Sequence, residues 1–263
     1  MPGGVRRLLR PDDEAVRLIL GPDPPRVLVA VAHPDDETVG AGILLSRLPD
    51  VWIVHATDGA PRDARFRARD FDGTREEYAD VRRRELETAM GRIGIGPDRL
   101  LSVGIPDQEA VFEVPRLARE LAGLVRRLQP GIVLTMAYEG GHPDHDAVAL
   151  AVRLANPPAV VEMALYHAAP GTKRMVAGEF LPGPAEAILG LSPADRSLKE
   201  AMTADFATQR ETLRAFLPPG PERFRPAPMY DFTRPPHAGR LQYELWGFPI
   251  TGTSWRLHAK RSL

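Results

Sequence analysis

The sequence predicts an α/β protein: a Rossmann-like three-layer sandwich with a mostly parallel central sheet and helices on both faces. From Arg26 onwards, short apolar runs rich in β-branched residues alternate with amphipathic segments, as in repeated βα units. The chain has 263 residues, of which 43% are hydrophobic and 26% charged, so it carries enough apolar material for a sizeable core. We therefore expect a single domain over residues 1–263.

Each predicted element is recognised by its hydrophobic periodicity. The expected strands are Val27–Ala32, Val51–Ala56, Leu100–Val103, Ile132–Ala137 and Val160–His167. The expected helices lie near Val39–Leu48, Arg75–Ile93, Pro115–Leu128, His145–Leu154 and Ser197–Leu217. The stretch Gly59–Gly73 has little apolar content, which predicts a long exposed loop of the kind that often acts as a lid.

A Pro-rich stretch, FLPPGPERFRPAPMYDFTRPP, follows the last predicted helix. Proline lacks a backbone N–H and breaks helices, so this stretch is not expected to continue a helix or to form a central strand. We predict a C-terminal extension, about residues 216–263, that packs on the surface of the domain.

Composition excludes several classes of function. The 34 Lys and Arg residues balance 35 Asp and Glu residues, so no global positive field attracts nucleic acid or anionic lipid. The Arg-rich segment Arg62–Arg84 is interleaved with acids, which favours a solvated surface over a nucleic-acid interface. Charges interrupt the apolar residues at the N-terminus, so we predict neither a secretory signal nor a membrane span. We therefore expect a cytoplasmic protein. A homo-oligomer stays an open alternative to a monomer.

Two polar motifs directly follow predicted strands. The run RVLVAVA leads into HPDDE at residues 33–37, and GIVLTMA leads into YEGGHPDH at residues 138–145. Open α/β sheets bind ligands beyond the carboxyl ends of their strands. Imidazoles and carboxylates are costly to bury together without a cation, and with no cysteine in the chain they are the available metal ligands. The sequence therefore predicts a metal site at this edge.

The residue types suggest how such a site would work. Two neutral imidazoles and one carboxylate, with a position left for water, make the usual catalytic metal site, and we predict His33, Asp36 and His145 as the ligands. The side chain of Asp35 diverges from that of Asp36, which makes Asp35 the predicted general base. His142 is expected either to protonate the departing nitrogen or to stabilise the oxyanion.

Neighbouring residues of the second motif have supporting roles in this hypothesis. Asp144 is expected to orient an imidazole from outside the ligand set. His145 shares a helix face with apolar residues such as Val148, so its ring projects from the buried end of the helix. Gly140 and Gly141 are predicted to let the backbone approach the substrate closely.

Three further residues near the predicted edge have simpler readings. Glu37 is expected to begin the helix that follows the first motif, where an acid favours the helix dipole. His55 lies within a predicted strand and is expected in the core. His167 ends the fifth strand at the same edge as the motifs, so it is a candidate for lining the pocket.

With AHPDDE after the first strand and HPDH after a later one, the chain resembles the LmbE/PIG-L family of metal-dependent N-deacetylases, which act on N-acetylglucosaminyl compounds and related conjugates. The resemblance extends from about Arg26 to about Gln209. It implies that each chain binds one divalent metal ion and that this ion is zinc. It also implies ligands at His33, Asp36 and His145, a base at Asp35, and an acid or oxyanion-stabilising group at His142.

The resemblance suggests substrate contacts as well. Arg82 and Glu85 match a family RxxE pattern whose arginine reaches the substrate side of the pocket; the alternative is an ion pair between them at i,i+3 spacing. Asp107 matches a position associated with sugar contact, and its alternative is an ordinary Asx-turn. Some members place a tyrosine where this chain has Gly140, and the nearest tyrosine here is Tyr138.

Together these features predict a zinc-dependent hydrolase that removes an N-acetyl group from an amino sugar or amino-sugar conjugate, a small-molecule substrate. An amidase acting on a larger acyl conjugate is the first alternative. A non-haem iron enzyme with the same two-His, one-carboxylate site is the second, although a third His and a spare Asp suit hydrolysis better. A nucleotide-binding module is disfavoured because the first strand ends in acids rather than in GxGxxG.

Overall fold

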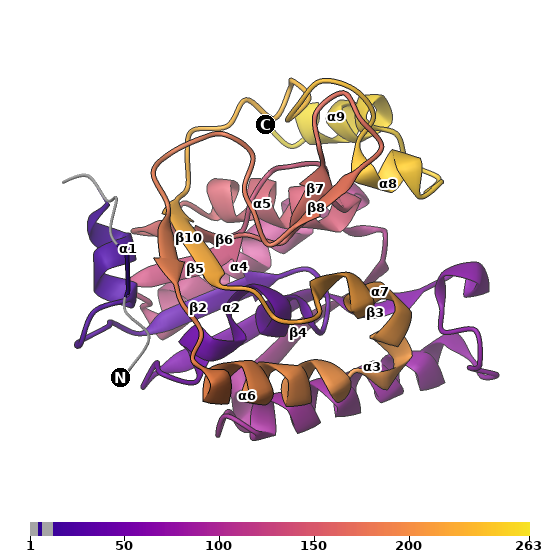
Figure 1. Cartoon of the computed structure of the whole chain (residues 1–263). Helices are drawn as coiled ribbons and strands as arrows, with labels where there is room; N and C mark the ends of the chain where they lie inside the picture. Colours follow the sequence, from indigo (N-terminus) through magenta and orange to yellow (C-terminus); the bar gives the residue numbers. More distant parts are fainter. Residues whose placement is uncertain (1–4, 7–12) are drawn as a thin grey trace.

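An eight-stranded sheet with the order β1-β9-β10-β6-β5-β2-β3-β4 forms the centre of the computed structural model, which describes residues 5–6 and 13–263 (Figure 1). The parallel strands are β2 (Val27–Val31), β3 (Val51–Pro61), β4 (Leu100–Asp107), β5 (Ile132–Met136) and β6 (Val160–Met163). The antiparallel strands β10 (Glu222–Pro226), β9 (Ala187–Leu189) and β1 (Val5–Arg6) continue the sheet beyond β6. The predicted α/β fold with a mostly parallel sheet is therefore confirmed.

Helices cover both faces of this sheet (Figure 1). On one face lie α4 (Val114–Leu128), α5 (Pro143–Ala155) and α9 (Gly252–Lys260). On the other lie α2 (Asp36–Leu45), α3 (Arg75–Gly91) and α6 (Pro193–Ala204). Shorter elements are α1 (Glu14–Ile19), α7 (Arg210–Leu213), α8 (Gln242–Leu245) and the hairpin of β7 (Tyr166–Ala168) and β8 (Met175–Ala177). Every residue of β2 and β5 is buried, which explains why these strands read as continuous apolar runs.

The order of the strands places both polar motifs at one point. From β2 the chain proceeds to β3 and β4 on one side, whereas β5 and β6 lie on the other side of β2. Strand order thus reverses between β2 and β5, the position where ligands bind in open α/β sheets. Residues 33–37 follow β2 and residues 138–145 follow β5, so both motifs extend from the carboxyl ends of adjacent strands.

Several predicted boundaries are wrong, each for a local reason. β3 continues to Pro61 because its pairing with β4 persists through two register shifts, so the predicted loop Gly59–Gly73 begins inside a strand. The expected helix Ser197–Leu217 starts earlier, at Pro193, where Ser192 forms a capping box, and it is interrupted after Ala204. The expected strand Val160–His167 is divided into β6 and β7.

The Pro-rich stretch is more than a surface cover, which corrects our expectation. Its residues 222–226 form β10 inside the central sheet, between β6 and β9. Prolines flank the ERFR run instead of interrupting it, so Phe224 pairs with Met163 on one side and Ala187 on the other. Pro226 closes the strand opposite Val161.

No helix in the described part of the chain combines the length and the apolar character needed to cross a bilayer. Residues 1–4 and 7–12, which belong to the N-terminal segment for which we predicted neither a signal nor a membrane span, lie outside the described residues.

Candidate active site

The turn after β2 holds Asp35 in an unusual backbone conformation. Its φ of 135° lies in a region that costs a non-glycine residue of order 1–3 kcal/mol. Glu37 lies in the first turn of α2, as predicted, and supports the backbone after β2. Its Oε2 accepts the Asp35 N–H at 3.1 Å and lies 2.9 Å from His55 Nε2. Glu37 is fully buried and His55 is 1% exposed. The pair therefore fixes the shape of the turn from beneath it.

The second motif begins α5, with His142 as the N-cap residue and Pro143 in the first turn. His142 Nδ1 accepts the backbone N–H of Asp144 at 3.2 Å. A neutral imidazole that accepts at Nδ1 carries its proton on Nε2, so the free edge of this ring is a hydrogen-bond donor. Burial and the nearby His33 lower the pKa of His142 well below its ordinary value, which favours this neutral form.

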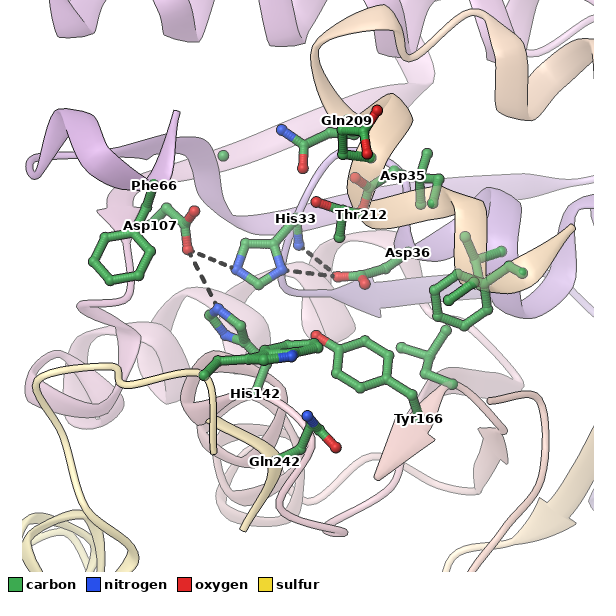
Figure 2. Close-up of a pocket in the computed structure, with 18 of the residues that line it drawn as sticks. His33, Asp35, Asp36, Phe66, Asp107, His142, Tyr166, Gln209, Thr212 and Gln242 are labelled. Atoms are coloured by element: carbon green, nitrogen blue, oxygen red, sulfur yellow. Dashed lines mark hydrogen bonds and ion pairs between the residues drawn. The ribbon is translucent and has the colours of Figure 1, made fainter. Parts of the chain in front are cut away.

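The two motifs meet as predicted. One ring nitrogen from each of His33, His142 and His145 lies within 4.8 Å of the others, and all three residues are buried. Asp36 lies between two of these rings. Its Oδ2 is 3.3 Å from His33 Nδ1 (Figure 2), and its Oδ1 is 3.1 Å from His145 Nε2. The structure thus places the three predicted ligands together, with the Asp36 carboxylate between His33 and His145.

The chemistry of this donor set fits a divalent cation. Imidazole nitrogens and carboxylate oxygens are the ligands that zinc takes when no thiolate is present. His145 Nε2 is buried and lies 3.1 Å from Asp36 Oδ1 without the alignment of a hydrogen bond. A cation shared with His33 and Asp36 would satisfy this nitrogen. The opposite edge of the His33 ring faces carboxylates, the arrangement that fixes metal-binding histidines in proteins.

Those carboxylates belong to Asp107 and Asp144. Asp144 is fully buried, accepts the backbone N–H groups of Gln108 at 2.6 Å and Ala110 at 2.9 Å, and lies 3.2 Å from His33 Nε2. It is therefore placed to orient an imidazole, and that imidazole is His33. Asp107 Oδ1 lies 3.0 Å from His33 Nε2 and 3.7 Å from His142 Nε2. Asp107 thus faces the histidines. Neither of the two roles predicted for it, the sugar contact and the Asx-turn, included this arrangement.

Arg82 reaches the site from α3. Its Nη2 donates to Asp35 Oδ2 at 2.9 Å and to the carbonyl oxygen of Pro34, and its Nη1 donates to Glu85 Oε2 at 3.3 Å. Glu85 is held in turn by the backbone N–H of Thr208 at 2.8 Å and its hydroxyl at 2.6 Å. The predicted ion pair with Glu85 exists, and Arg82 also grips Asp35. Burial, partly opposed by Arg82, raises the pKa of Asp35 to about 7.

A pocket of about 620 Å³ opens onto this cluster, a size within the range of roughly 300–1,000 Å³ that small-molecule sites occupy. The predicted site residues that line it are His33, Asp35, Asp36, Arg82, Asp107 and His142. Gln209, Glu211 and Thr212 add polar side chains to the wall. Phe66, which belongs to the predicted loop Gly59–Gly73, also lines the pocket, so this loop closes one side of it.

The sequence hypothesis missed one wall of this pocket. Tyr166 of β7 lines it, whereas the candidate His167 does not, since successive residues of a strand face opposite sides. A Cβ atom at Gly141 would lie 2.2 Å from the carbonyl oxygen of Tyr166, so this glycine makes room for β7 and not, as expected, for substrate. Tyr138 is turned away, and its hydroxyl donates to Arg234 O at 2.9 Å.

The rest of that wall comes from the C-terminal part of the chain. Phe216, Gln242, Trp246 and Phe248 line the pocket although they lie far from both motifs in sequence. No periodicity or motif in the sequence connects these residues with the histidines. Only the course of the chain over the sheet brings them there.

The fold and the site thus define an α/β protein with a buried His–Asp centre at the switch point of its sheet. Residues 28–156 match the family model described as PIG-L, GlcNAc-PI de-N-acetylase. The resemblance to the LmbE/PIG-L family that the two motifs indicated is therefore confirmed, and this segment contains both motifs.

Curated relatives are similar over the same part of the chain. The chain is 32% identical over 148 residues to 1D-myo-inositol 2-acetamido-2-deoxy-alpha-D-glucopyranoside deacetylase 2 of Catenulispora acidiphila, covering 48% of this chain and 49% of that protein. It is 33% identical over 130 residues to a probable N-acetyl-alpha-D-glucosaminyl L-malate deacetylase 2 of Bacillus subtilis, covering 48% and 58%. It is 30% identical over 139 residues to mycothiol S-conjugate amidase of Streptomyces coelicolor, covering 46% and 47%. The matches span about half the length of these relatives.

Solved structures share the fold at lower identity. N,N'-diacetylchitobiose deacetylase from Pyrococcus horikoshii superposes with a TM-score of 0.57 at 16% identity, covering 78% of this chain and 84% of that one. A 4-carboxy-2-hydroxymuconate hydratase from Pseudomonas putida superposes with a TM-score of 0.52 at 16% identity, covering 78% and 98%. Because one fold includes a deacetylase and a hydratase, the reaction must be argued from the site.

Proposed function

We propose that this protein is a zinc-dependent N-deacetylase that hydrolyses the N-acetyl group of an amino sugar or an amino-sugar conjugate. The observation that carries the proposal is the meeting of the two motifs, with Asp36 3.3 Å from His33 and 3.1 Å from His145 beside a pocket of about 620 Å³. The names of the curated relatives support the same reaction, because they include deacetylases of N-acetylglucosaminyl compounds.

His33, Asp36 and His145 would hold the metal ion. When bound there, a divalent ion lowers the pKa of a water molecule towards neutrality and polarises the acyl carbonyl. Asp107 and Asp144 fix the His33 ring from its other edge, so the ligand is oriented before the ion arrives.

Asp35 acts as the general base in this mechanism. Its carboxylate accepts a proton from the water as the water oxygen forms a bond to the acyl carbon. Arg82 holds the carboxylate at 2.9 Å, and the strained turn around Asp35 keeps it apart from Asp36. When the tetrahedral intermediate collapses, the C–N bond breaks and Asp35 returns the proton to the departing nitrogen. The products are acetate and a free amine.

His142 stabilises the oxygen that becomes negative. Its Nδ1 accepts the Asp144 N–H, so its Nε2–H is available to donate to an oxyanion in the pocket. This tautomer supports the oxyanion role over proton donation, the two roles that the sequence left open. Tyr166 supplies a phenol on the same side, with its hydroxyl directed towards the cluster in Figure 2. The second motif offers no phenol at this place, because Gly140 stands where some family members have a tyrosine and the Tyr138 side chain is turned away.

The test combines metal analysis with a screen of N-acetyl amino sugars and their conjugates for acetate release. The purified protein is expected to bind about one zinc ion per chain and to release acetate from at least one compound. Asp35→Asn should keep the metal and lose most of the turnover. Asp98→Asn is the matched control, because the Asp98 side chain is 78% exposed, and it should keep both. Full turnover in Asp35→Asn, or a protein that binds no divalent metal after reconstitution, would reject the mechanism.

An amidase that acts on a larger acyl conjugate is the second candidate. The size of the pocket favours it, since about 620 Å³ exceeds what an acetylated monosaccharide fills, and one relative is named an amidase. A series of glucosamines with acetyl, butyryl and phenylacetyl groups on the nitrogen separates the two. A kcat/KM that rises with acyl size would identify the amidase. The metal content of the same samples distinguishes zinc from iron.

A further inference from the structure

We infer that the pocket contains a second subsite that binds an aromatic group joined to the amino sugar. The subsite is a row of five aromatic side chains, called here the aromatic belt: Phe66, Tyr166, Phe216, Trp246 and Phe248. This inference rests on the proposed function and deepens it. It names the substrate class as N-acyl amino sugars that carry an aromatic aglycone.

The rings of the belt are in continuous contact. The centroid distances are 5.8 Å from Phe216 to Tyr166, 5.4 Å from Tyr166 to Trp246, 6.1 Å from Trp246 to Phe248 and 4.9 Å from Phe248 to Phe66. Each distance lies within the range of about 4.5–7 Å that favourable aromatic pairs adopt. The belt is therefore a packed, preorganised surface, and a ligand ring that joins it does not have to order flexible side chains.

The belt starts at the reacting centre. The Tyr166 ring lies 5.2 Å from the ring of His145, and the Phe248 ring lies 5.0 Å from the ring of His142. An amino sugar whose acyl group is bound beside these histidines therefore has its remaining substituents within reach of the belt.

The opposite wall of the pocket is polar, which separates the two halves of the substrate. Gln209 and Thr212 lie on the side of the cluster away from Tyr166 (Figure 2). Their amide and hydroxyl groups suit sugar hydroxyls. A sugar ring that faces this wall stacks on one or two aromatic rings, so most of the belt is left for another part of the ligand. Trp246 is 41% exposed, and a bound aromatic group would remove this surface from water.

The belt is built mainly by parts of the chain outside the segment that defines the family. Tyr166, Phe216, Trp246 and Phe248 all lie beyond residues 28–156. The catalytic motifs and the belt therefore come from separate segments. A substrate preference that depends on the belt is a property of this chain's own C-terminal half.

The experiment compares three β-glycosides of N-acetylglucosamine: phenyl, cyclohexyl and methyl. For the wild-type protein we expect kcat/KM for the phenyl glycoside to exceed that for each of the others by about tenfold, because aromatic pairing adds to simple burial. Phe248→Leu and, separately, the more exposed Trp246→Leu should reduce the phenyl-to-methyl ratio towards one. Phe112→Leu is the matched control. Phe112 is 52% exposed and lies outside the pocket, so this variant should keep the ratio.

Binding measured by calorimetry on Asp35→Asn keeps the subsite separate from the reaction. The phenyl glycoside should bind about tenfold more tightly than the methyl glycoside, and the advantage should shrink in Asp35→Asn/Phe248→Leu. Equal affinities for all three glycosides overturn the subsite, even if the protein is a deacetylase. Equal affinities for phenyl and cyclohexyl overturn its aromatic character. A phenyl preference that Phe248→Leu removes, in a protein that releases acetate from none of the glycosides and from no compound of the wider screen, supports the subsite and rejects the proposed function.

Discussion

Two of the clusters of buried charged residues in this protein differ in how completely their hydrogen-bonding groups are paired. In the first, which we call the Arg225 cluster, one guanidinium on β10 donates to four acceptors, one of which is the Tyr230 hydroxyl at 3.0 Å from Nη2. Arg225 Nε donates to Glu162 Oε2 at 2.9 Å, Nη2 donates to Glu139 Oε1 at 3.0 Å, and Nη1 donates to Leu181 O at 2.8 Å. The Tyr230 hydroxyl also donates to Glu162 Oε2 at 2.9 Å. Every nitrogen of this arginine has an acceptor.

The second cluster is the candidate active site, and its donors and acceptors do not balance. Arg82 donates to Asp35, but Asp36 and Asp107 face imidazoles, and the buried His145 Nε2 lies 3.1 Å from Asp36 Oδ1 without the alignment of a hydrogen bond. Buried polar groups in folded proteins are nearly always satisfied. Charge density alone therefore does not mark a functional centre. The Arg225 cluster stabilises the fold, whereas the active-site cluster is where we propose that a ligand binds.

The largest expected effect is on the incomplete cluster. His145→Ala removes one of the three proposed ligands, so the protein should lose its metal and its turnover should fall by about three orders of magnitude or more. Metal analysis and acetate release check this. His258→Ala is the control, because His258 lies on α9 and contacts Phe112 outside the site. A variant at His145 that keeps its metal would show that the comparison between the clusters is mistaken.

The next largest effect is on the complete cluster. Arg225→Met should lower the free energy of unfolding by about 3–5 kcal/mol, because it leaves two buried carboxyl groups without their cation. Urea denaturation measures the change. Arg223→Met on the same strand is a sharp control: Arg223 makes a partly exposed ion pair with Glu186, which contributes about 0–1 kcal/mol. Equal losses in the two variants would mean that the Arg225 cluster has no special structural role.

A smaller effect is expected for Arg82, which belongs to the active-site cluster and donates from both terminal nitrogens to protein atoms. Arg82→Met should reduce kcat by about 10- to 100-fold with metal content and KM nearly unchanged, since Arg82 orients Asp35 and leaves the ligands alone. Steady-state kinetics separate this result from the alternative. A large rise in KM with kcat preserved would instead assign Arg82 to substrate binding.

The last expected effect concerns pH, and it is spread over several pH units. Burial raises the pKa of Glu139 from its usual value near 4.5 to about 8, against the opposing influence of Arg225. The folded protein therefore holds a proton that the unfolded chain releases between about pH 4.5 and pH 8. The resulting stabilisation is complete below pH 4.5 and is lost as the pH rises to 8, with a slope of up to about 1.4 kcal/mol per pH unit for this proton.

Urea unfolding at several pH values between 5 and 8 measures this slope. Glu139→Gln should flatten the decline of stability with pH, because it removes the titrating group. Glu186→Gln, which changes a partly exposed carboxylate, should follow the wild type. Parallel curves for Glu139→Gln and the wild type would contradict the assignment of the proton to Glu139.

The sequence was informative about the first half of the fold and much less so about the second. β2 and β5 were predictable because both faces of these strands are buried, and the motifs after them carry unmistakable chemistry. By contrast, β10 was missed because the prolines around it suggested a surface segment, and its place in the sheet depends on strands β6 and β9. For the site, Asp35, Asp36 and the histidines were predictable from residue type, whereas Tyr166 was not.

The sequence by itself determined which groups would gather at the edge of the sheet, since a motif that follows a buried parallel strand must emerge at its carboxyl end. The tertiary structure decided how those groups are supported and what surrounds them. It placed Asp107 against the histidines, Arg82 on Asp35, and the aromatic belt over the pocket. The physical reason is distance along the chain: local pattern specifies strands and turns, but contacts between segments that are dozens of residues or more apart depend on how the layers pack.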